Sequence, residues 1–232
     1  MLEYLQSILD QPWKPVPRPA LIAWLLFYCG FLAYAASARG AFLFIDSANL
    51  IVHEGGHNLF GWFGPSLGLW GGTLLQWLVP LLLAAYFFGE RQITGFVFCL
   101  FFFFENWLYT ATYMADARTQ LLPLVTTGDP DFVEHDFHAI FSHLGVLSYD
   151  TRIAAVVRIL GWCGMLAVPV WFAVQGWKGR RELEQGPDFS VLSRFTAQRK
   201  PPQIPLISDR EKSEPATVQA DHSELAKAPN LR

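Results

Sequence analysis

Long apolar segments constrain this chain more than any other feature of its sequence. Each of five segments is close to the roughly 20 residues that a helix needs to cross about 30 Å of hydrocarbon. These segments cover residues 20–38, 41–60, 67–88, 93–115 and 153–174. The sequence therefore predicts an all-α integral membrane protein with about five transmembrane helices.

The composition supports a membrane protein and argues against a nucleic-acid binder. Only 16% of the residues are charged, whereas a soluble domain has about 25%. All nine tryptophans lie before residue 178, and the formal net charge is -3. That charge lacks the basic excess of a nucleic-acid-binding protein. We therefore expect residues 1–177 to form a polytopic membrane domain in contact with a lipid bilayer and without a nucleic-acid partner.

The composition changes after Trp177. Residues 178–232 contain many prolines, mixed charges and few aromatics, which predicts a disordered tail. Five spans would place the two termini on opposite sides of the membrane. A small excess of positive residues on the tail side predicts a cytoplasmic tail. The membrane is expected to be the cell (inner) membrane. The oligomeric state is left open.

The second apolar segment contains the sequence His53-Glu54-Gly55-Gly56-His57. On a helix, His53 and His57 are one turn apart and share a face, so both imidazoles can bind one metal ion. In this pattern the two histidines bind zinc, and Glu54 acts as a general base. A polar helix end at the membrane surface is the alternative interpretation. Ionisable residues inside a membrane are costly and usually functional, which favours a site with one Zn²⁺ per chain.

A catalytic zinc site needs a third protein ligand. Asp116 ends the fourth apolar segment, which runs parallel to the second, so its carboxylate is expected at the depth of the two histidines. The following loop offers competing ligands, and these alternatives stay open: His135, Asp136, His138 and His143.

These residues together resemble the site-2 protease family of membrane-embedded zinc metallopeptidases. The resemblance covers a three-helix core of about residues 41–118. It implies that His53, His57 and Asp116 bind zinc, that Glu54 is the base, and that the substrates are membrane-spanning helices of other proteins. The family usually has glycine after the distal aspartate, whereas Asp116 lies between Ala115 and Ala117.

The sequence thus predicts an intramembrane zinc metalloprotease that hydrolyses peptide bonds of membrane-spanning substrates. The alternative is a membrane metal-binding protein without proteolysis, acting as a sensor, transporter or assembly factor. The two functions differ in their need for Glu54, because a protease requires the base whereas a passive site requires only ligands.

Overall fold

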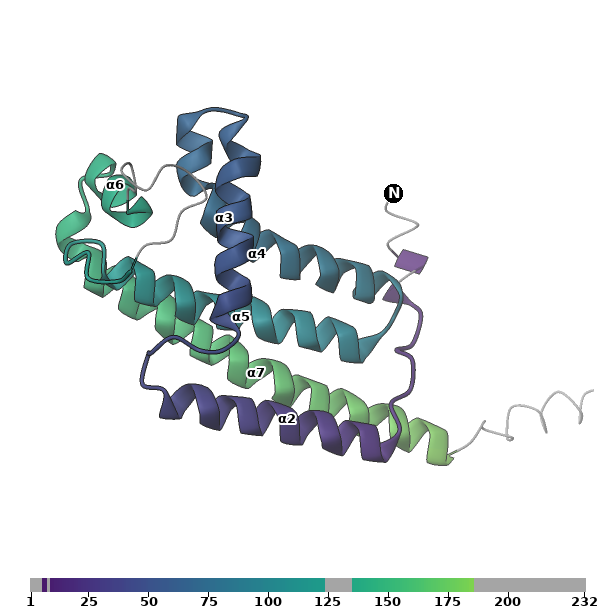
Figure 1. Ribbon diagram of the computed structural model, residues 1–232. Helices are drawn as coiled ribbons and strands as arrows, with labels where there is room; N and C mark the ends of the chain where they lie inside the picture. The colour runs from purple at the N-terminus through teal and green to yellow at the C-terminus, as the bar shows by residue number, and fades with distance from the viewer. Residues whose placement is uncertain (1–5, 8, 124–134, 186–232) are drawn as a thin grey trace, which may run out of the picture. The chain divides into compact units, whose positions relative to one another are not determined.

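The computed structural model describes residues 6–7, 9–123 and 135–185, with side chains through residue 178. The regular elements in these ranges are all helical, which confirms the all-α prediction (Figure 1). They are α2 (Arg18–Ser37), α3 (Asp46–Gly61), α4 (Pro65–Gly89), α5 (Ile93–Ala115), α6 (Asp136–His143), the 3-10 turn η2 (Leu147–Tyr149) and α7 (Asp150–Gln185).

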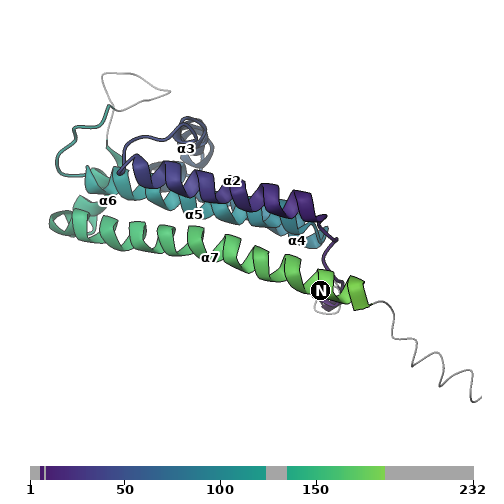
Figure 2. The same cartoon turned by 90° about the horizontal axis from the view of Figure 1, so that it is seen from below.

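Four helical segments are long and apolar enough to cross a membrane: α2, α4, α5 and Leu147–Lys178, which contains most of α7. The predicted span at 41–60 is not one of them. Its helix, α3, has 16 residues and is about 24 Å long, shorter than the hydrocarbon core. Figure 2 shows α3 almost end-on while α2, α5 and α7 extend lengthwise. The expected count of five spans is therefore corrected to four candidate spans within the described residues.

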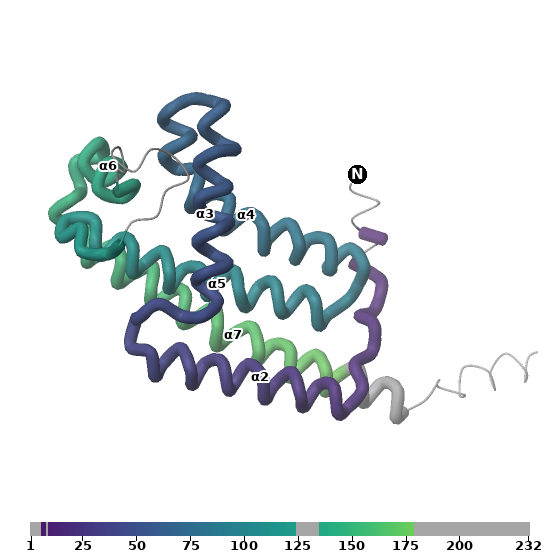
Figure 3. The backbone as a smooth tube through the Cα atoms, viewed as in Figure 1, coloured from purple at the N-terminus to yellow at the C-terminus, as the bar shows by residue number. Residues whose placement is uncertain are grey.

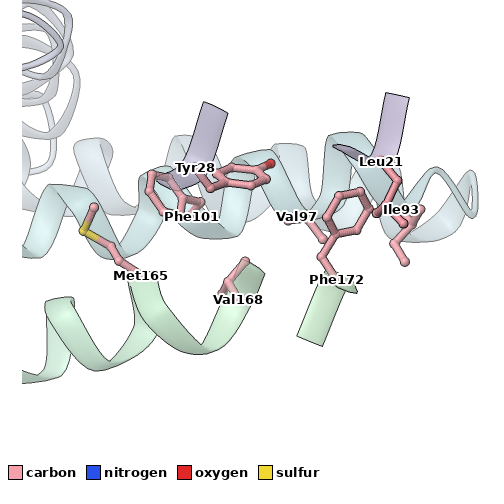
Figure 4. Packing of buried hydrophobic residues seen from close by; sticks show 8 residues of the cluster. All are labelled: Leu21, Tyr28, Ile93, Val97, Phe101, Met165, Val168 and Phe172. Atoms are coloured by element: carbon pink, nitrogen blue, oxygen red, sulfur yellow. The ribbon is translucent and has the colours of Figure 1, made fainter. Parts of the chain in front are cut away.

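Helices α2, α5 and α7 enclose a shared apolar core, which Figure 4 shows from close by. Its buried members are Leu21, Tyr28, Ile93, Val97, Phe101, Met165, Val168 and Phe172. The ring centroids of Tyr28 and Phe101 lie 4.8 Å apart. Because lipid is as apolar as these side chains, close packing holds such helices together.

Contacts at one end of this bundle fix the topology of the chain. The Trp13 ring packs edge-on against Trp171 of α7, with centroids 5.9 Å apart. The backbone N–H of Lys14 donates to the carbonyl of Arg91 in the α4–α5 turn at 2.9 Å. The start of α2 and the later part of α7 therefore lie at the same end of the bundle. This corrects the expectation, based on five spans, that they lie on opposite sides.

Helices α3 and α4 approach each other through glycines. A Cβ atom added to Gly56 would lie 2.8 Å from the Gly72 Cα and 2.6 Å from the Gly71 carbonyl carbon. Both neighbours are backbone atoms that cannot rotate away, so the contact requires glycine at this position. Farther along, α4 leaves α3 and turns to run beside α5 (Figure 3). Pro80 inside α4 lacks the N–H for the Gln76 carbonyl, which is a common cause of such a bend.

The short helix α6 covers the C-terminal end of α5. Its Phe137, Ile140 and Phe141 are buried against Met114 and Ala117. This packing carries the N-terminus of α6 toward α3 and α4. Helix α7 continues past Trp177 to Gln185, so the first part of the predicted tail is helical. The rest of that tail lies outside the described residues.

Candidate metal centre

Three side chains that could hold a metal ion converge where α3, α4 and α6 meet. Two come from α3, His53 and His57, and the third is Asp136, the first residue of α6. One donor atom of each lies within 4.8 Å of the other two. The Asp136 Oδ2 atom is 2.9 Å from His53 Nε2 and 3.1 Å from His57 Nε2. Three donors bound tetrahedrally to one zinc ion would lie roughly 3.3 Å apart, given bonds of about 2.0–2.1 Å.

The hydrogen bonds of His57 require a cation or an additional proton at the centre of this cluster. His57 Nδ1 lies 2.8 Å from the carbonyl oxygen of Gly68, which can only accept, so Nδ1 carries a hydrogen. In a neutral imidazole Nε2 is then an acceptor, yet it faces the acceptor Oδ2 of Asp136. A metal cation or an additional proton between them removes this conflict. The donor set of two imidazoles and one carboxylate fits a metal ion.

Side chains and backbone from α4 and α5 orient these donors. His53 Nδ1 contacts Gln76 Oε1 at 2.7 Å, so its Nε2 faces the centre. The backbone N–H of Asp136 donates to the Tyr113 hydroxyl at 3.2 Å. Partners of this kind fix the tautomer and ring orientation of metal-ligating histidines. Burial alone would raise the pKa of Asp136, but its contacts with His53 and His57 hold that pKa below the usual value.

Gly72 makes room for the ring of His53. A Cβ atom at this position would lie 2.5 Å from His53 Nε2 and 2.6 Å from Cδ2 and Cε1. The imidazole therefore lies flat against the α4 backbone. Gly55, which is next to Gly56 in the motif, has no such role, because its added Cβ would be 3.9 Å from Leu75 Cδ2.

Glu54 lies beside the three donors but is not one of them. It is half-buried and lines, with His53, a cavity of about 680 Å³. A second cavity, of about 480 Å³, is lined by His57 and Asp136. The cluster is thus reached from two sides, and the carboxylate of Glu54 is on the side of the larger cavity.

Asp116 is placed elsewhere, which differs from the expectation that it faces His53 and His57. Its carboxylate accepts hydrogen bonds from the Thr119 hydroxyl at 2.5 Å and from the backbone N–H groups of Leu121 and Leu122, both at 2.9 Å. Burial raises its pKa, but these bonds outweigh that effect and lower the pKa. Asp116 therefore closes the end of α5. The position beside the histidines that was predicted for Asp116 is taken by Asp136.

The other loop histidines support α6 and do not join the cluster. His135 Nδ1 accepts from the His138 backbone N–H at 3.3 Å, and its Nε2 is 3.6 Å from Asp116 Oδ2. His138 Nδ1 lies 2.8 Å from the Ala117 carbonyl. The His143 side chain is exposed and lines the smaller cavity. His135 and His138 therefore link the start of α6 to the end of α5 and hold Asp136 in place.

The sequence contains a weak signal for Asp136. An acidic residue begins a short amphipathic helix whose apolar residues, Phe137, Ile140 and Phe141, follow helical spacing. This pattern predicts a helix that lies on the protein, with an acid at its N-terminus. It does not reveal which histidines that acid meets.

Comparison with known proteins identifies no relative: no protein-family model, no curated protein and no solved structure matches this chain.

Proposed function

We propose that this chain is a membrane-embedded zinc metallopeptidase. The observation that carries the proposal is the convergence of His53, His57 and Asp136, with Glu54 next to them on the wall of a large cavity. Two histidines and one carboxylate are the protein ligands of many catalytic zinc sites, which keep a fourth position open. The resemblance of the motif to the site-2 protease family favours the same activity.

His53, His57 and Asp136 would hold the metal. Zinc in such a site lowers the pKa of a bound water to about 7 and polarises a carbonyl group. Glu54 is adjacent to His53, and the helix turns its side chain about 100° away from that ligand. Its carboxylate would then be the group that accepts a proton from the attacking water and passes it to the leaving amine.

The surroundings of the site favour a substrate that comes from the membrane. The cavity beside Glu54 is lined mainly by apolar residues, among them Leu50, Leu108 and Trp162. Its wall is built by α2, α3, α5, α7 and the α2–α3 connection, and α2, α5 and α7 belong to candidate membrane spans. A peptide segment that leaves the lipid can remain in an apolar environment until it reaches the metal. We therefore propose membrane-spanning proteins as substrates.

The Glu54→Gln substitution tests this function. The variant keeps the shape of the side chain and removes the base, so it should retain one zinc ion per chain and lose cleavage of a single-span reporter protein in proteoliposomes. Glu90→Gln, at the exposed α4–α5 turn, is the control and should cleave normally. Elemental analysis of both proteins distinguishes zinc from iron, which also accepts two histidines and one carboxylate. Full cleavage by Glu54→Gln would refute the proposed mechanism.

The second candidate function is metal transfer or sensing without proteolysis. It is favoured by the two cavities that reach the cluster from different sides, since His53 lines one and His57 lines the other. A transporter requires such access from both sides, whereas a hydrolase requires one. Zinc uptake into proteoliposomes that contain a zinc-sensitive dye, undiminished in Glu54→Gln, would support this alternative.

A further inference from the structure

Arg158 is a positive charge inside a candidate membrane span. It lies in α7, within the segment Leu147–Lys178, and its side chain is half-buried. An arginine in the middle of a membrane helix costs about 2.5–3.5 kcal/mol on insertion scales, and such residues mostly face a cavity and mark a ligand or ion pathway. Arg158 lines the large cavity that also contains His53 and Glu54.

The hydrogen bonds of Arg158 to the described residues use few of its donors. Its Nη2 donates to the Thr112 hydroxyl oxygen at 3.2 Å, and that hydroxyl donates to the Leu108 carbonyl at 3.1 Å. Among the side chains that the structure describes (residues 6–7, 9–123 and 135–178), no carboxylate forms an ion pair with Arg158. A guanidinium group has five N–H donors. Thr112 therefore orients the group without neutralising it.

Three acidic residues line the cavity, Glu54 and the pair Asp46 and Glu105, and the pair shares one hydrogen-bonding partner. Asn49 donates to Glu105 Oε2 at 3.0 Å and to Asp46 Oδ1 at 3.3 Å, which groups the two acids around one amide. On α5, Glu105 precedes Thr112 by about 10 Å along the helix axis, at a rise of 1.5 Å per residue. Glu105 and Thr112, which holds Arg158, thus contact the cavity at different levels of α5.

A second positive charge lies near Arg158 at the connection between α2 and α3. Arg39 is exposed there and lines the same cavity. A Cβ atom added to the neighbouring Gly40 would be 4.0 Å from Arg158 Nη1, which places the guanidinium close to this connection. The cavity thus has a basic part next to a mostly apolar wall.

We propose that this cavity binds a single-chain amphiphile with a carboxylate head, whose carboxylate pairs with Arg158 and whose chain lies along the apolar wall. A guanidinium binds the two oxygens of one carboxylate through two parallel hydrogen bonds. The cavity volume of about 680 Å³ is within the range of small-molecule sites. This binding site does not depend on the proposed hydrolysis, and its test uses no activity measurement.

The experiment compares dodecanoate with dodecanol, which have the same chain length and differ in head-group charge. The purified full-length protein in a nonionic detergent is titrated with each compound, and the midpoint of thermal unfolding is recorded. We expect dodecanoate to bind about tenfold more tightly or better, because a hydrogen bond to a charged group is stronger than one to a neutral group. This preference should disappear in Arg158→Gln. It should persist in Arg152→Gln, an exposed residue of the same helix that does not line the cavity.

Equal stabilisation of the wild-type protein by dodecanoate and dodecanol would overturn the proposal, and this result does not depend on whether a variant folds. An undiminished preference in Arg158→Gln would also overturn it. Dodecyl phosphate is the third probe, and stronger binding of this compound than of dodecanoate would contradict the assignment to carboxylates. Arg158→Lys keeps the charge without the paired donors, so it should bind dodecanoate more weakly than wild type while still preferring it to dodecanol.

Discussion

Replacing Gly72 with alanine should expel the metal although Gly72 is not a ligand. The added methyl group would lie 2.5–2.6 Å from three ring atoms of His53, whereas ordinary contacts begin at 3.4 Å. The ring must therefore move by about 0.9 Å, the difference between 3.4 and 2.5 Å. Metal–ligand distances tolerate changes of about 0.2 Å. The substitution thus displaces His53 by several times the tolerance of the site.

The loss of zinc affinity in Gly72→Ala can be estimated from milder changes to metal sites. Loss of a group that only orients a ligand lowers metal affinity about 10- to 100-fold. Displacement of the ligand itself should lower it by at least about 100-fold. Alanine is favoured over glycine in a helix interior by about 0.5–1 kcal/mol, so helix propensity by itself would stabilise the folded variant. Overpacking of the α3–α4 contact should reduce stability by about 1–3 kcal/mol.

The measurement is zinc affinity by competition with a chelator, together with metal content by elemental analysis. Gly55→Ala is the matched control, since it also replaces a helical glycine near His53 with alanine and its methyl group would meet only Leu75 Cδ2 at 3.9 Å. Circular dichroism and size-exclusion chromatography establish that both variants are folded. A folded Gly72→Ala protein with wild-type zinc affinity would refute the assignment of His53 as a ligand held against α4.

Three further predictions follow from the described contacts. Asp136→Ala should abolish stoichiometric zinc binding, whereas Asp116→Ala should retain zinc and lower the melting temperature. Elemental analysis and thermal unfolding measure the two effects, and the reverse pattern would restore Asp116 as the ligand. The topology can be tested with single cysteines, one before α2 and one after Gln185, in a protein whose natural cysteines are replaced. An impermeant maleimide should label both from the same side of the membrane, and labelling from opposite sides would contradict the four-span topology. A chain truncated after Gln185 should still insert into membranes and bind zinc, because the contacts of the cluster and of the α2–α5–α7 core lie before that point; loss of metal on truncation would refute this.

The local part of the candidate metal site could be predicted from sequence. His53 and His57 are separated by one helical turn, and the geometry of an α-helix fixes their separation whatever the rest of the chain does. The same regularity placed Glu54 beside them. The length of the apolar segments likewise identified the four helices that are candidates to cross a membrane. Helix α3 was misjudged because its apolar segment continues into residues 41–45, which precede the helix.

The third donor depended on tertiary structure. Asp136 is 83 residues from His53 in sequence, and no local rule relates the two positions. Its place is decided by the packing of Phe137, Ile140 and Phe141 on the end of α5, and by the bonds of His135 and His138. Asp116 appeared to be at the correct depth, but its own loop satisfies its carboxylate.

The sequence by itself therefore determined the apolar helices and the histidine pair, because helix length and helical spacing are properties of neighbouring residues. Only the tertiary structure decided which carboxylate completes the cluster and why Gly56 and Gly72 are glycines. Both answers depend on the distance between helices α3 and α4 and on the position of α6, which result from side-chain packing between segments far apart in the chain.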